Sequence, residues 1–585
     1  MSEEWLLKWG LAGVQEFISQ ATKVRELAAG SRIVALVARA AGHAAEEAGA
    51  EIVLPQAGGR RYWPHQAVVR LSQGSRQKAA QLGSRMTETA KLAWEELASE
   101  ERGSLPRMIT ILAEPDVVAS QTAQALETYW VAVPVNGSYR EAFDSLLSAY
   151  EDRRWTRDFL QNAMFSDPEH QPWCCSQCGT RPAVVQPPSG GWPEAVHFAS
   201  KAERLCAVCV AKRQWSAAEL GGEFPSTHRL ARSRFLRDPT FTPLLAVLGT
   251  GARFLDDLDE TRKLLVSSTA RSADDMQTLV LEALRAQPLL LERLLRLSPY
   301  YAIVVCDGDR MGRWFSGEFF ADSTDTRPHQ EVLSRSLFAF ADAIAQDIEP
   351  FEKFGARLVY AGGDDALLLL PLDFLLPVVQ LIGRRWQGLR DAVQKLVEPG
   401  SPLPTLSLHA SVLHAKAPLQ PAVHRLHELL DVAKDRGRRN CVSVHCAIQA
   451  GAEAHWIGRW EEVESLSGTV EAFSSWRRHD VSHPGRMELD ARRGSRLSTS
   501  LLHACLEASP AFLSPGMPGA AFRREINRLW IRSDSPANDA VREWLFDRAS
   551  GKALMGTDIE AGEALASTIE VVAFLARELA WENQP

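Results

Sequence analysis

The sequence feature that most constrains the fold of this chain is a tight turn, Gly362-Gly363-Asp364-Asp365, between two short apolar runs. The run before the turn ends at Ala361, and the run after it begins at Ala366. Short apolar runs on either side of glycines are typical of buried strands joined in a hairpin. Because Gly362 and Gly363 lack Cβ atoms, they tolerate positive φ and let a bulky group such as a triphosphate approach the backbone. The two aspartates are then expected at the mouth of the hairpin.

A third carboxylate, Asp307, is predicted to lie beside this hairpin. It follows the run Tyr301 to Cys306, which is apolar enough to be a central strand. Two helical patterns, one before and one after the hairpin, and a strand-like run from Leu406 to Leu413 complete a βαββαβ order. That order predicts a ferredoxin-like palm, in which the first and third strands are antiparallel neighbours, so that Asp307 meets Asp364 and Asp365. The helical positions are Leu333, Leu337, Phe340, Ile344 and Ile348, then Val378, Ile382, Trp386, Leu389 and Val393.

Three carboxylates in one place point to nucleotidyl transfer. This reaction uses two divalent cations about 4 Å apart to hold the attacking and leaving oxygens of an in-line displacement. Carboxylates this close repel one another unless cations neutralise them. Asp307, Asp364 and Asp365 are therefore predicted to be catalytic residues and metal ligands. The alternative is an ordinary surface hairpin, because aspartate and glycine are common in turns.

Two basic side chains lie near the C-terminal end of the predicted palm. The segment Leu429 to Asn440 closes a third helix and enters an alternating strand through Val442 and Val444. Lys434 and Arg438 stand four residues apart near the end of that helix, where they could reach phosphate oxygens as a point charge and a planar fork. A solvated helix end, whose cations suit the helix dipole, explains them equally well.

The cysteines predict a separate metal site. Cys175-x-x-Cys178 and Cys206-x-x-Cys209 form two pairs, and each can place two thiolates on one tetrahedral zinc ion at about 2.3 Å. Four sulfurs close the coordination shell, so the site is expected to be structural. Disulfides or unrelated buried thiols are the alternatives, and Cys174 competes with Cys175 for the first position, although the spacing favours Cys175. The remaining cysteines are expected in cores: Cys306, Cys441, Cys446 and Cys505.

Length and composition indicate a large multidomain protein. A chain of 585 residues is too long for one core, and 45% apolar and 24% charged residues are ordinary for globular proteins. The acidic start, Met1 to Glu4, and the lack of an apolar run long enough to span a bilayer predict a cytoplasmic location without membrane contact. A reducing compartment also favours zinc thiolates over disulfides.

The charge limits how the chain could bind nucleic acid. A net charge of −8 argues against broad coating by a phosphate backbone, so contact with RNA must be local. Two arginine groups are candidates, and either could equally be solvated surface: Arg229, Arg232, Arg234 and Arg237, then Arg477, Arg478, Arg486, Arg492, Arg493 and Arg496.

At these motifs the chain resembles known families. The predicted palm is similar to nucleotide cyclase palms, including diguanylate cyclases, which share a Gly-Gly-Asp turn and an ending like Ala433-Lys434-x-x-Gly437-Arg438. More closely, it resembles the large subunit of type III CRISPR effector complexes, the Cas ten family, in its Cmr branch. The segments that carry this likeness are Tyr301 to Gly312, the Gly-Gly-Asp-Asp turn, His414 to Leu419, Gly13 to Ile18, Arg25 to Leu27, and both cysteine segments. The resemblance covers most of residues 1 to 450.

The resemblance implies a cyclic oligoadenylate synthase that is activated when target RNA pairs with a guide RNA. ATP would be the substrate, and Asp307, Asp364 and Asp365 would hold two Mg²⁺ or Mn²⁺ ions. Gly308, Asp309, Gly362, Gly363, Lys434 and Arg438 would contact the nucleotide. Guide RNA, target RNA and the backbone, small and adjacent subunits of a Cmr-type complex would be the partners.

Two other functions remain open at this stage. One is an inert scaffold that binds guide RNA and sister subunits. The other is a free-standing diguanylate cyclase, although that signature normally continues with Glu-Phe where this chain has Asp365-Ala366, and it lacks the cysteine segments. No N-terminal His-Asp nuclease domain is expected, because the first palm begins almost at residue 1 and the only His-Asp dipeptide is His479-Asp480.

These landmarks predict an α+β multidomain chain with two ferredoxin-like palms, a zinc module and helical domains. The expected domains are 1–165 (a silent palm), 166–225 (zinc-binding), 226–298 (helical), 299–450 (the catalytic palm) and 451–585 (helical). The first palm is predicted to be silent because its nearest counterpart of the acidic turn, Gly58-Gly59-Arg60-Arg61, is basic. Ser31 is expected to cap a helix from Ile33 to Ala48.

Overall fold

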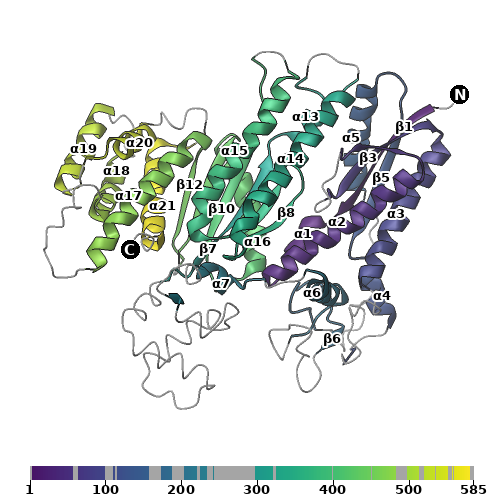
Figure 1. Cartoon of the computed structure of the whole chain (residues 1–585), viewed down its shortest axis with the longest axis horizontal. Coiled ribbons are helices and arrows are strands. Elements are labelled where there is room, and N and C mark those ends of the chain that lie inside the picture. The colour runs from purple at the N-terminus through teal and green to yellow at the C-terminus, as the bar shows by residue number, and fades with distance from the viewer. Residues whose placement is uncertain are drawn as a thin grey trace.

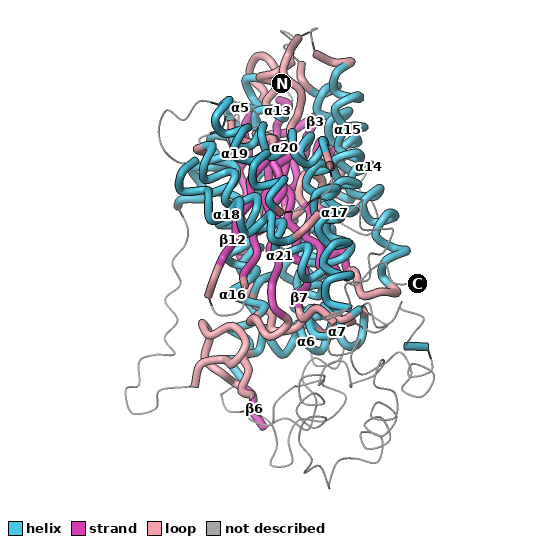
Figure 2. Tube along the Cα trace, turned by 90° about the vertical axis from the view of Figure 1, so that its left-hand side faces the viewer, coloured by secondary structure: helices cyan, strands magenta, loops and turns pink. Residues whose placement is uncertain are grey.

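The described part of the chain contains two large β-sheets, each packed against helices, followed by a bundle of helices at the C-terminal end (Figure 1). This mixed architecture confirms the predicted α+β class. Figure 2, turned by a quarter, shows strands in the interior of the molecule with helices around them. The computed structural model describes residues 3–56, 63–98, 110–111, 115–156, 173–186, 203–220, 224–233, 241–242, 297–320, 325–397, 400–448, 451–482, 497–512, 519–533, 535, 537–550, 557 and 559–579.

The second sheet contains the residues that the sequence singled out. Its strand order is β12-β11-β10-β7-β9-β8. Strand β7 lies between β9 and β10 and is antiparallel to both, so the first and third strands of the predicted motif are neighbours, as expected. The strands are β7 (Tyr300–Gly308), β8 (Arg357–Ala361), β9 (Ala366–Pro371), β10 (Leu406–His414), β11 (Cys441–Ala447) and β12 (Glu453–Arg459).

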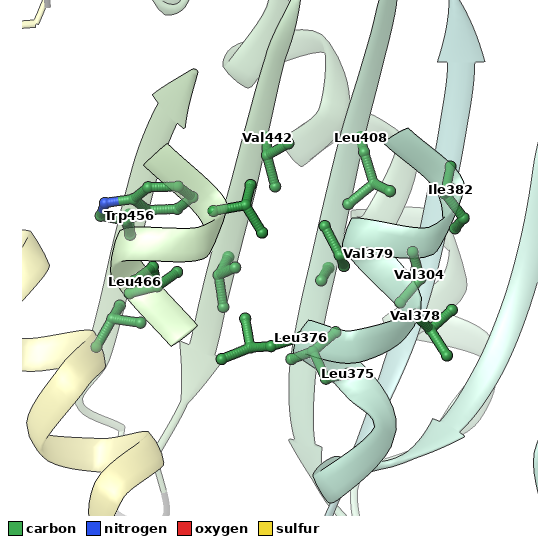
Figure 3. Packing of buried hydrophobic residues seen from close by; sticks show 14 of the residues in the cluster. Val304, Leu375, Leu376, Val378, Val379, Ile382, Leu408, Val442, Trp456 and Leu466 are labelled. Carbon is green, nitrogen blue, oxygen red and sulfur yellow. The ribbon is translucent and has the colours of Figure 1, made fainter. Parts of the chain in front are cut away.

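Helices cover both faces of this sheet because successive residues of its strands point to opposite sides. Val304 of β7 packs in one buried cluster with α14 (Arg327–Glu352) and α15 (Leu375–Gln394). Figure 3 shows this cluster, with Leu376 and Val379 of α15 pointing at the sheet and Trp456 at its other end. Ile303, the next residue of β7, packs on the opposite face with α16 (Leu419–Arg436).

The first sheet has the order β2-β3-β1-β5, which repeats the relative order β8-β9-β7-β10 of the second sheet. Its strands are β1 (Glu3–Ala12), β2 (Glu51–Leu54), β3 (Gln66–Gly74) and β5 (Glu127–Pro134). Its helices are α1 (Val14–Ser19), α2 (Val24–Glu47), α3 (Arg76–Ala98), α4 (Pro115–Ala123) and α5 (Tyr139–Trp155). Residues 58–61, predicted as the basic counterpart of the acidic turn, lie outside the described residues.

The predicted helix start at Ser31 is wrong. Helix α2 begins at Val24, with Lys23 at the N-cap position. The carboxylate of Glu26 accepts hydrogen bonds from the backbone N–H groups of Thr22 (2.8 Å) and Lys23 (3.1 Å), which would otherwise lack partners at the helix end. Ser31 is therefore an interior helical residue, buried in the first sheet domain.

The two sheet domains share one buried core. Val34 and Ala41 of α2 belong to the same apolar cluster as Tyr301 and Ile303 of the second sheet. Polar contacts add to this junction: Ser19 Oγ lies 3.1 Å from His424 Nε2, the Gln56 N–H donates to Ser334 Oγ (3.0 Å), and Tyr139 OH donates to Gln330 Oε1 (2.9 Å). The first domain therefore covers part of the surface of the second sheet domain.

Shorter elements lie outside the two large sheets. They are the strands β4 (Thr110–Ile111) and β6 (Val185–Gln186), which pair with each other, and the helices α6 (Ala207–Glu219), α7 (Thr227–Ala231) and α13 (Met311–Phe315). Two 3₁₀ turns, Leu372–Phe374 and Trp460–Glu462, precede α15 and α17. Most of the predicted helical segment 226–298 lies outside the described residues. No helix among the described residues is both long and apolar enough to cross a membrane.

The chain beyond residue 451 differs from the expected all-helical pattern. Strand β12 pairs with β11 and extends the second sheet, because its alternating burial suits a sheet edge. The helices α17 (Val463–Ser482), α18 (Thr499–Phe512), α19 (Gly519–Arg532), α20 (Asp539–Ala549) and α21 (Ala561–Leu579) follow. Trp456 of β12, Trp530 of α19 and Trp544 of α20 are buried.

A buried ion pair joins this bundle to the second sheet. The side chain of Arg548 is fully buried, and its Nη1 lies 3.1 Å from Glu462 Oε1. Arg548 also donates from Nη2 to the Ile457 carbonyl (2.9 Å) and from Nε to Thr568 Oγ1 (3.1 Å). One guanidinium thus connects α20 with α21, with β12 and with the turn that follows β12.

We predict that Arg548→Met lowers the free energy of unfolding by about 3–5 kcal/mol, because Glu462 would be left buried without its cation. Arg528→Met is the matched control, because Arg528 pairs with Glu525 on the exposed side of α19, where such a pair contributes at most about 1 kcal/mol. Denaturant titrations of both variants measure the difference. Equal losses would contradict the role of the buried pair.

Candidate functional site

The acidic turn has the geometry of a tight hairpin. Ala361 and Ala366 pair at its base, and the Gly362 N–H donates to the Asp365 carbonyl at 2.8 Å. Gly363 has a φ of 114°, a conformation that residues with a Cβ rarely adopt. A Cβ on Gly362 would lie 2.4 Å from Asp365 Oδ1. Both glycines are therefore required by the backbone and by the position of the carboxylate.

Strand β7 ends against this turn. The Gly308 N–H donates to the Asp364 carbonyl at 3.0 Å. A Cβ on Gly308 would lie 2.9 Å from the Asp364 Cβ and 2.7 Å from Met311, so glycine allows this approach. The contact places Asp307, one residue earlier, at the same sheet edge as Asp364 and Asp365.

The three aspartates do not form a closed ligand set in this structure. In the described part of the chain, only the four cysteines bring three or more possible ligand atoms within 4.8 Å of one another. Asp307 instead forms an ion pair with Lys434 on α16. The ammonium group of Lys434 therefore neutralises one of the three carboxylates.

The electrostatics of the turn reflect the same crowding. Burial, together with the charges of Asp365 and Asp307, raises the pKa of Asp364 well above its ordinary value. Burial and then the charge of Asp307 raise the pKa of Asp365 to about 7. A nearby cation would stabilise the charged form of these carboxylates. Carboxyl groups in a cleft whose pKa values are raised in this way mark a candidate functional site.

The segment that carries Lys434 and Arg438 has an unusual backbone. Arg438, Arg439 and Asn440 all have positive φ, between 48° and 61°. Arg459 supports the strained turn by donating from Nη1 to the Arg439 carbonyl (2.7 Å). Lys434 is brought to the acidic turn, whereas Arg438 is exposed on the strained turn just beyond the helix.

Asp309 does not fit the predicted nucleotide contact. Its side chain is 3% exposed, and its oxygens accept hydrogen bonds from Thr405 Oγ1 (2.8 Å), Ser407 Oγ (2.9 Å) and the Asn440 N–H (2.9 Å). These three partners come from β10 and its preceding loop, and from the strained turn. Asp309 therefore ties the end of β7 to the segments around the site, and its acceptors are occupied within the protein.

A cavity of about 570 Å³, which we call the interdomain cavity, opens beside the acidic turn. The first sheet domain contributes Gly13 to Glu16, Ile18, His65, Tyr129 and Arg154, and the second contributes Gly362, Asp365 and His427. Burial, with Lys8 and Arg154 nearby, lowers the pKa of His65 to about 4, so its imidazole is neutral at pH 7. Apart from the acidic turn itself, the sequence signalled only the Gly13 to Ile18 segment. His65, Tyr129, Arg154 and His427 were missed because no local pattern marks them.

The four predicted cysteines meet in space. Cys175, Cys178, Cys206 and Cys209 are buried, and their sulfurs lie within 4.8 Å of one another. The Sγ atoms of Cys178 and Cys206 are 3.9 Å apart, close to the separation of about 3.8 Å that a zinc tetrahedron with bonds of about 2.3 Å requires. No disulfide joins them, and Cys174 is exposed outside the cluster. The donor set therefore fits a structural zinc ion.

The predicted arginine groups are only partly described. Arg232 is fully buried and lies 3.1 Å from His228, so it is not part of a surface patch. Arg229 is half-buried, and the side chains of the other candidate arginines lie outside the described residues. His479 and Asp480 fall within α17, but their side chains also lie outside that set.

Comparison with known proteins identifies the second sheet domain. Residues 300–443 match the family described as Cas10/Cmr2, second palm domain. Over these residues, the chain is similar to the Cas10/Cmr2 family. A curated relative, the CRISPR system Cmr subunit Cmr2 of Pyrococcus furiosus, is 30% identical over 181 residues, which span 28% of this chain and 20% of that protein.

Two solved structures share the fold of this chain. The type III-B Cmr-beta complex in its apo state contains a chain that matches with a TM-score of 0.61 at 13% identity, over 92% of this chain and 78% of that one. The same type of complex bound to cognate target RNA gives a TM-score of 0.60 at 13% identity, over 91% and 78%. At this identity the likeness shows the fold alone.

We predict that Asp365 makes stability fall with rising pH. Its folded pKa of about 7 lies above the ordinary 3.8, so between these values the folded protein holds a proton that the unfolded chain releases, and folding weakens as pH rises through that window. Asp365→Asn removes the contribution of this carboxyl group and should make the fall shallower, while Asp364, whose pKa is also raised, keeps its own contribution. Each tenfold difference in proton affinity between the folded and unfolded chain corresponds to about 1.4 kcal/mol.

Denaturation midpoints from pH 4 to pH 7, without added divalent cations, provide the measurement. Asp391→Asn, at an exposed carboxylate on α15, is the control and should follow the wild-type profile. Parallel profiles for wild type and Asp365→Asn would show that the carboxyl group titrates normally.

Proposed function

We propose that this chain is the large subunit of a Cmr-type CRISPR effector complex, and that it synthesises cyclic oligoadenylates from ATP when target RNA pairs with the guide. The observation that carries the proposal is the interdomain cavity, because the acidic turn of the Cas10/Cmr2 palm forms part of its wall. A volume of about 570 Å³ is within the range of sites for nucleotide-sized ligands.

In this proposal the first sheet domain is a second, ferredoxin-like palm without catalytic carboxylates. Among its described residues that line the cavity, Glu16 is the only acidic one. The cavity is lined instead by the neutral imidazole of His65, the aromatic ring of Tyr129 and the cationic group of Arg154. In this proposal they would contact the base, the ribose and the phosphate of a nucleotide. ATP would bind across the cavity, with its α-phosphate near Asp365 and the 3′-hydroxyl of a second ATP opposite.

The chain's own residues would then position the reactants. Gly362 and Gly363 leave the turn without side chains, so phosphates can approach its backbone. Asp307, Asp364 and Asp365 would hold two Mg²⁺ or Mn²⁺ ions, which when bound would neutralise the charge that develops on the attacking and leaving oxygens. Lys434, and Arg438 beside it, would contact phosphate oxygens. Positioning and charge neutralisation account for most of the catalysis in this class of reaction.

Lys434 has two states in this scheme. Its ion pair with Asp307 keeps the acidic edge neutralised while no cation is bound. A divalent cation at Asp307 would replace that charge and release the ammonium group toward a phosphate. The same side chain therefore stabilises the empty site and contributes to the loaded one.

The proposed partners of this chain are inferred from proteins with a similar fold. The relatives that share this fold are chains of Cmr-beta complexes, one of which is bound to cognate target RNA. We therefore propose guide RNA, target RNA and Cmr-type subunits as partners, and a structural zinc ion at the four cysteines.

We predict that the double variant Asp364→Ala, Asp365→Ala lowers cyclic oligoadenylate synthesis at least about 100-fold, because the charge-neutralising site is removed. The reconstituted complex is incubated with ATP, Mg²⁺ and matched or unmatched target RNA, and products are identified by mass spectrometry. RNA binding and assembly should be unchanged in the variant, and Asp391→Ala should retain full synthesis.

Three outcomes would overturn this assignment. Unchanged synthesis by the double variant would place the chemistry elsewhere. Stoichiometric ATP binding without turnover in the presence of matched RNA would indicate a scaffold. Turnover of GTP by the isolated chain without RNA would indicate a diguanylate cyclase.

A further inference from the structure

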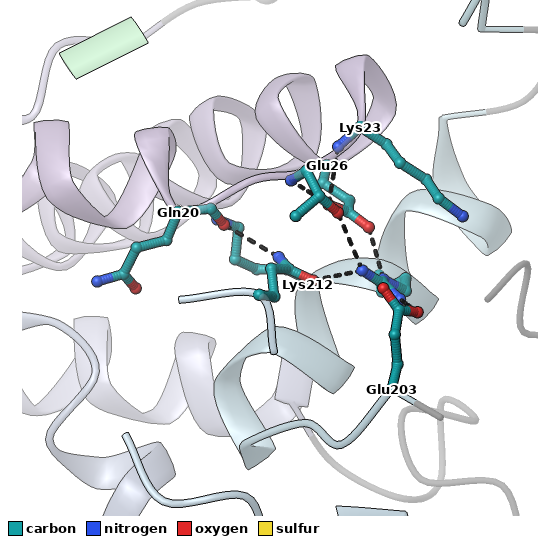
Figure 4. A network of polar contacts seen from close by, with 8 residues as sticks. Gln20, Lys23, Glu26, Glu203 and Lys212 are labelled. Carbon is teal, nitrogen blue, oxygen red and sulfur yellow. Dashed lines mark hydrogen bonds and ion pairs between the residues drawn. The ribbon is translucent and has the colours of Figure 1, made fainter. Parts of the chain in front are cut away.

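Two buried basic residues connect the cysteine module, defined as residues 173–186 and 203–220, with the segment between α1 and α2. Lys212 and Arg213 follow the second cysteine pair on α6, and they are 0% and 2% exposed. Figure 4 shows Lys212 and Gln20 facing each other, with Glu26 and Glu203 in the same cluster. This buried polar network has no role in the proposed chemistry, yet burying such charges is costly unless each is paired.

Lys212 supplies the partners that the end of α1 lacks. Its Nζ donates to the carbonyl oxygens of Phe17 and Gln20, the latter at 2.9 Å. The last carbonyls of a helix have no partner within the helix, so a buried end needs donors from elsewhere. The ammonium group also lies 4.9 Å from the centre of the Phe17 ring. Lys212 therefore acts as the C-terminal cap of α1 from a distant part of the sequence.

Two other residues of the cysteine module also form hydrogen bonds with Gln20. Gln177, between the first two cysteines, donates from Nε2 to the Gln20 carbonyl at 3.0 Å, and Arg181 Nη1 donates to Gln20 Oε1 at 2.8 Å. Gln20 in turn donates from Nε2 to Glu16 Oε1 at 2.9 Å. A chain of direct hydrogen bonds thus runs from the four-cysteine loop to Glu16.

Arg213 fixes the start of α2 in the same way. It forms ion pairs with Glu26 and with Glu203, the latter at 2.8 Å, and it donates to Gln177 Oε1 at 2.8 Å. Glu26 is the residue that caps the N-terminal end of α2. Both ends of the α1–α2 connection are therefore attached to the cysteine module.

Helix α1 is also a wall of the interdomain cavity. Gly13 to Glu16 and Ile18 line it, opposite Gly362 and Asp365 of the acidic turn. On its other side, Ser19 Oγ lies 3.1 Å from His424 Nε2 on α16, the helix that carries His427 and Lys434. The position of α1 therefore affects the width of the cavity and its contact with α16.

We propose that Lys212 is a positioning residue for the interdomain cavity, and that the four-cysteine module sets the shape of the nucleotide site by capping α1. The inference rests on the proposed function where it takes this cavity as the ATP site. Six residues are too few for α1 to be stable alone, so its place depends on tertiary contacts. A module closed by four thiolates around one ion gives those contacts a rigid base.

The test compares two variants that each remove one fully buried cation. Lys212→Met keeps the stem of the side chain and removes the donors to Phe17 and Gln20. Arg548→Met, in the C-terminal bundle, is the matched control with a comparable cost of burial but no contact with α1. Both are studied in the full-length chain, below the temperature at which either unfolds.

Amide hydrogen exchange of residues 13–20 is the first measurement, because it needs no nucleotide. Exchange should become at least about tenfold faster in Lys212→Met and stay unchanged in Arg548→Met. Gln20→Leu is a milder variant that keeps Lys212 and the cysteines but cuts the link to Glu16, and it should give a smaller acceleration in the same segment. If residues 13–20 exchange at the same rate in Lys212→Met as in the wild-type protein, the proposal is overturned.

The second measurement concerns ATP in the reconstituted complex with matched target RNA. Lys212→Met should raise KM for ATP about fivefold or more while kcat changes less than about twofold, because a displaced wall weakens binding more than chemistry. Arg548→Met should leave KM unchanged. A lower kcat with unchanged KM in Lys212→Met would contradict a positioning role. If the wild-type complex does not use ATP, the proposed function fails, and hydrogen exchange still decides whether Lys212 holds α1.

Discussion

Repulsion among three carboxylates at one sheet edge is the constraint around which the second domain is built. The hydrogen bond from the Gly308 N–H to the Asp364 carbonyl brings Asp307 beside the acidic turn, and only glycine permits that approach. The resulting charge is reduced in two ways in this structure: Lys434 pairs with Asp307, and burial with the neighbouring charges raises the pKa of Asp364 and Asp365. In the proposed function, divalent ions would replace these protons and the charge of the lysine.

The second domain does not complete this site alone. Its outer face is covered by α16 and by α2 of the first domain, whose apolar residues share one core with Ile303 and its neighbours. Because that core is continuous, the wall formed by α1 is held at a fixed distance from the acidic turn, and a cavity remains between them. The first domain therefore contributes by shape and by neutral or cationic groups. A first domain with few acidic residues facing the cavity suits this role, since more carboxylates there would increase the repulsion.

Much of the second domain was predictable because its signals are local. Strands β7, β8, β9 and β10 and helices α14 and α15 follow from alternation and from apolar residues every three or four positions. The hydrogen bonds of Asp309 could not be predicted, because its partners Thr405, Ser407 and Asn440 lie about 100 residues or more away in the sequence. Ser31 was chosen as a cap on residue preference, whereas Glu26 provides the acceptors that decide the helix start. His65, Tyr129 and Lys212 gain their roles from contacts between distant segments, and no single-sequence pattern reports such contacts.

Buried charge reinforces junctions in this molecule that apolar packing also spans. The Arg548 and Glu462 pair joins the C-terminal bundle to β12, and Lys212 with Arg213 joins the cysteine module to α1 and α2. Replacing all members of such a pair together by well-packed apolar residues is often neutral or stabilising, so stability alone does not explain the charges. Each guanidinium or ammonium group, however, accepts only one arrangement of carbonyl and carboxylate partners, whereas apolar surfaces can slide. Where two modules must keep one relative position, as α1 must against the acidic turn, directional contacts fix the register that the hydrophobic core leaves free.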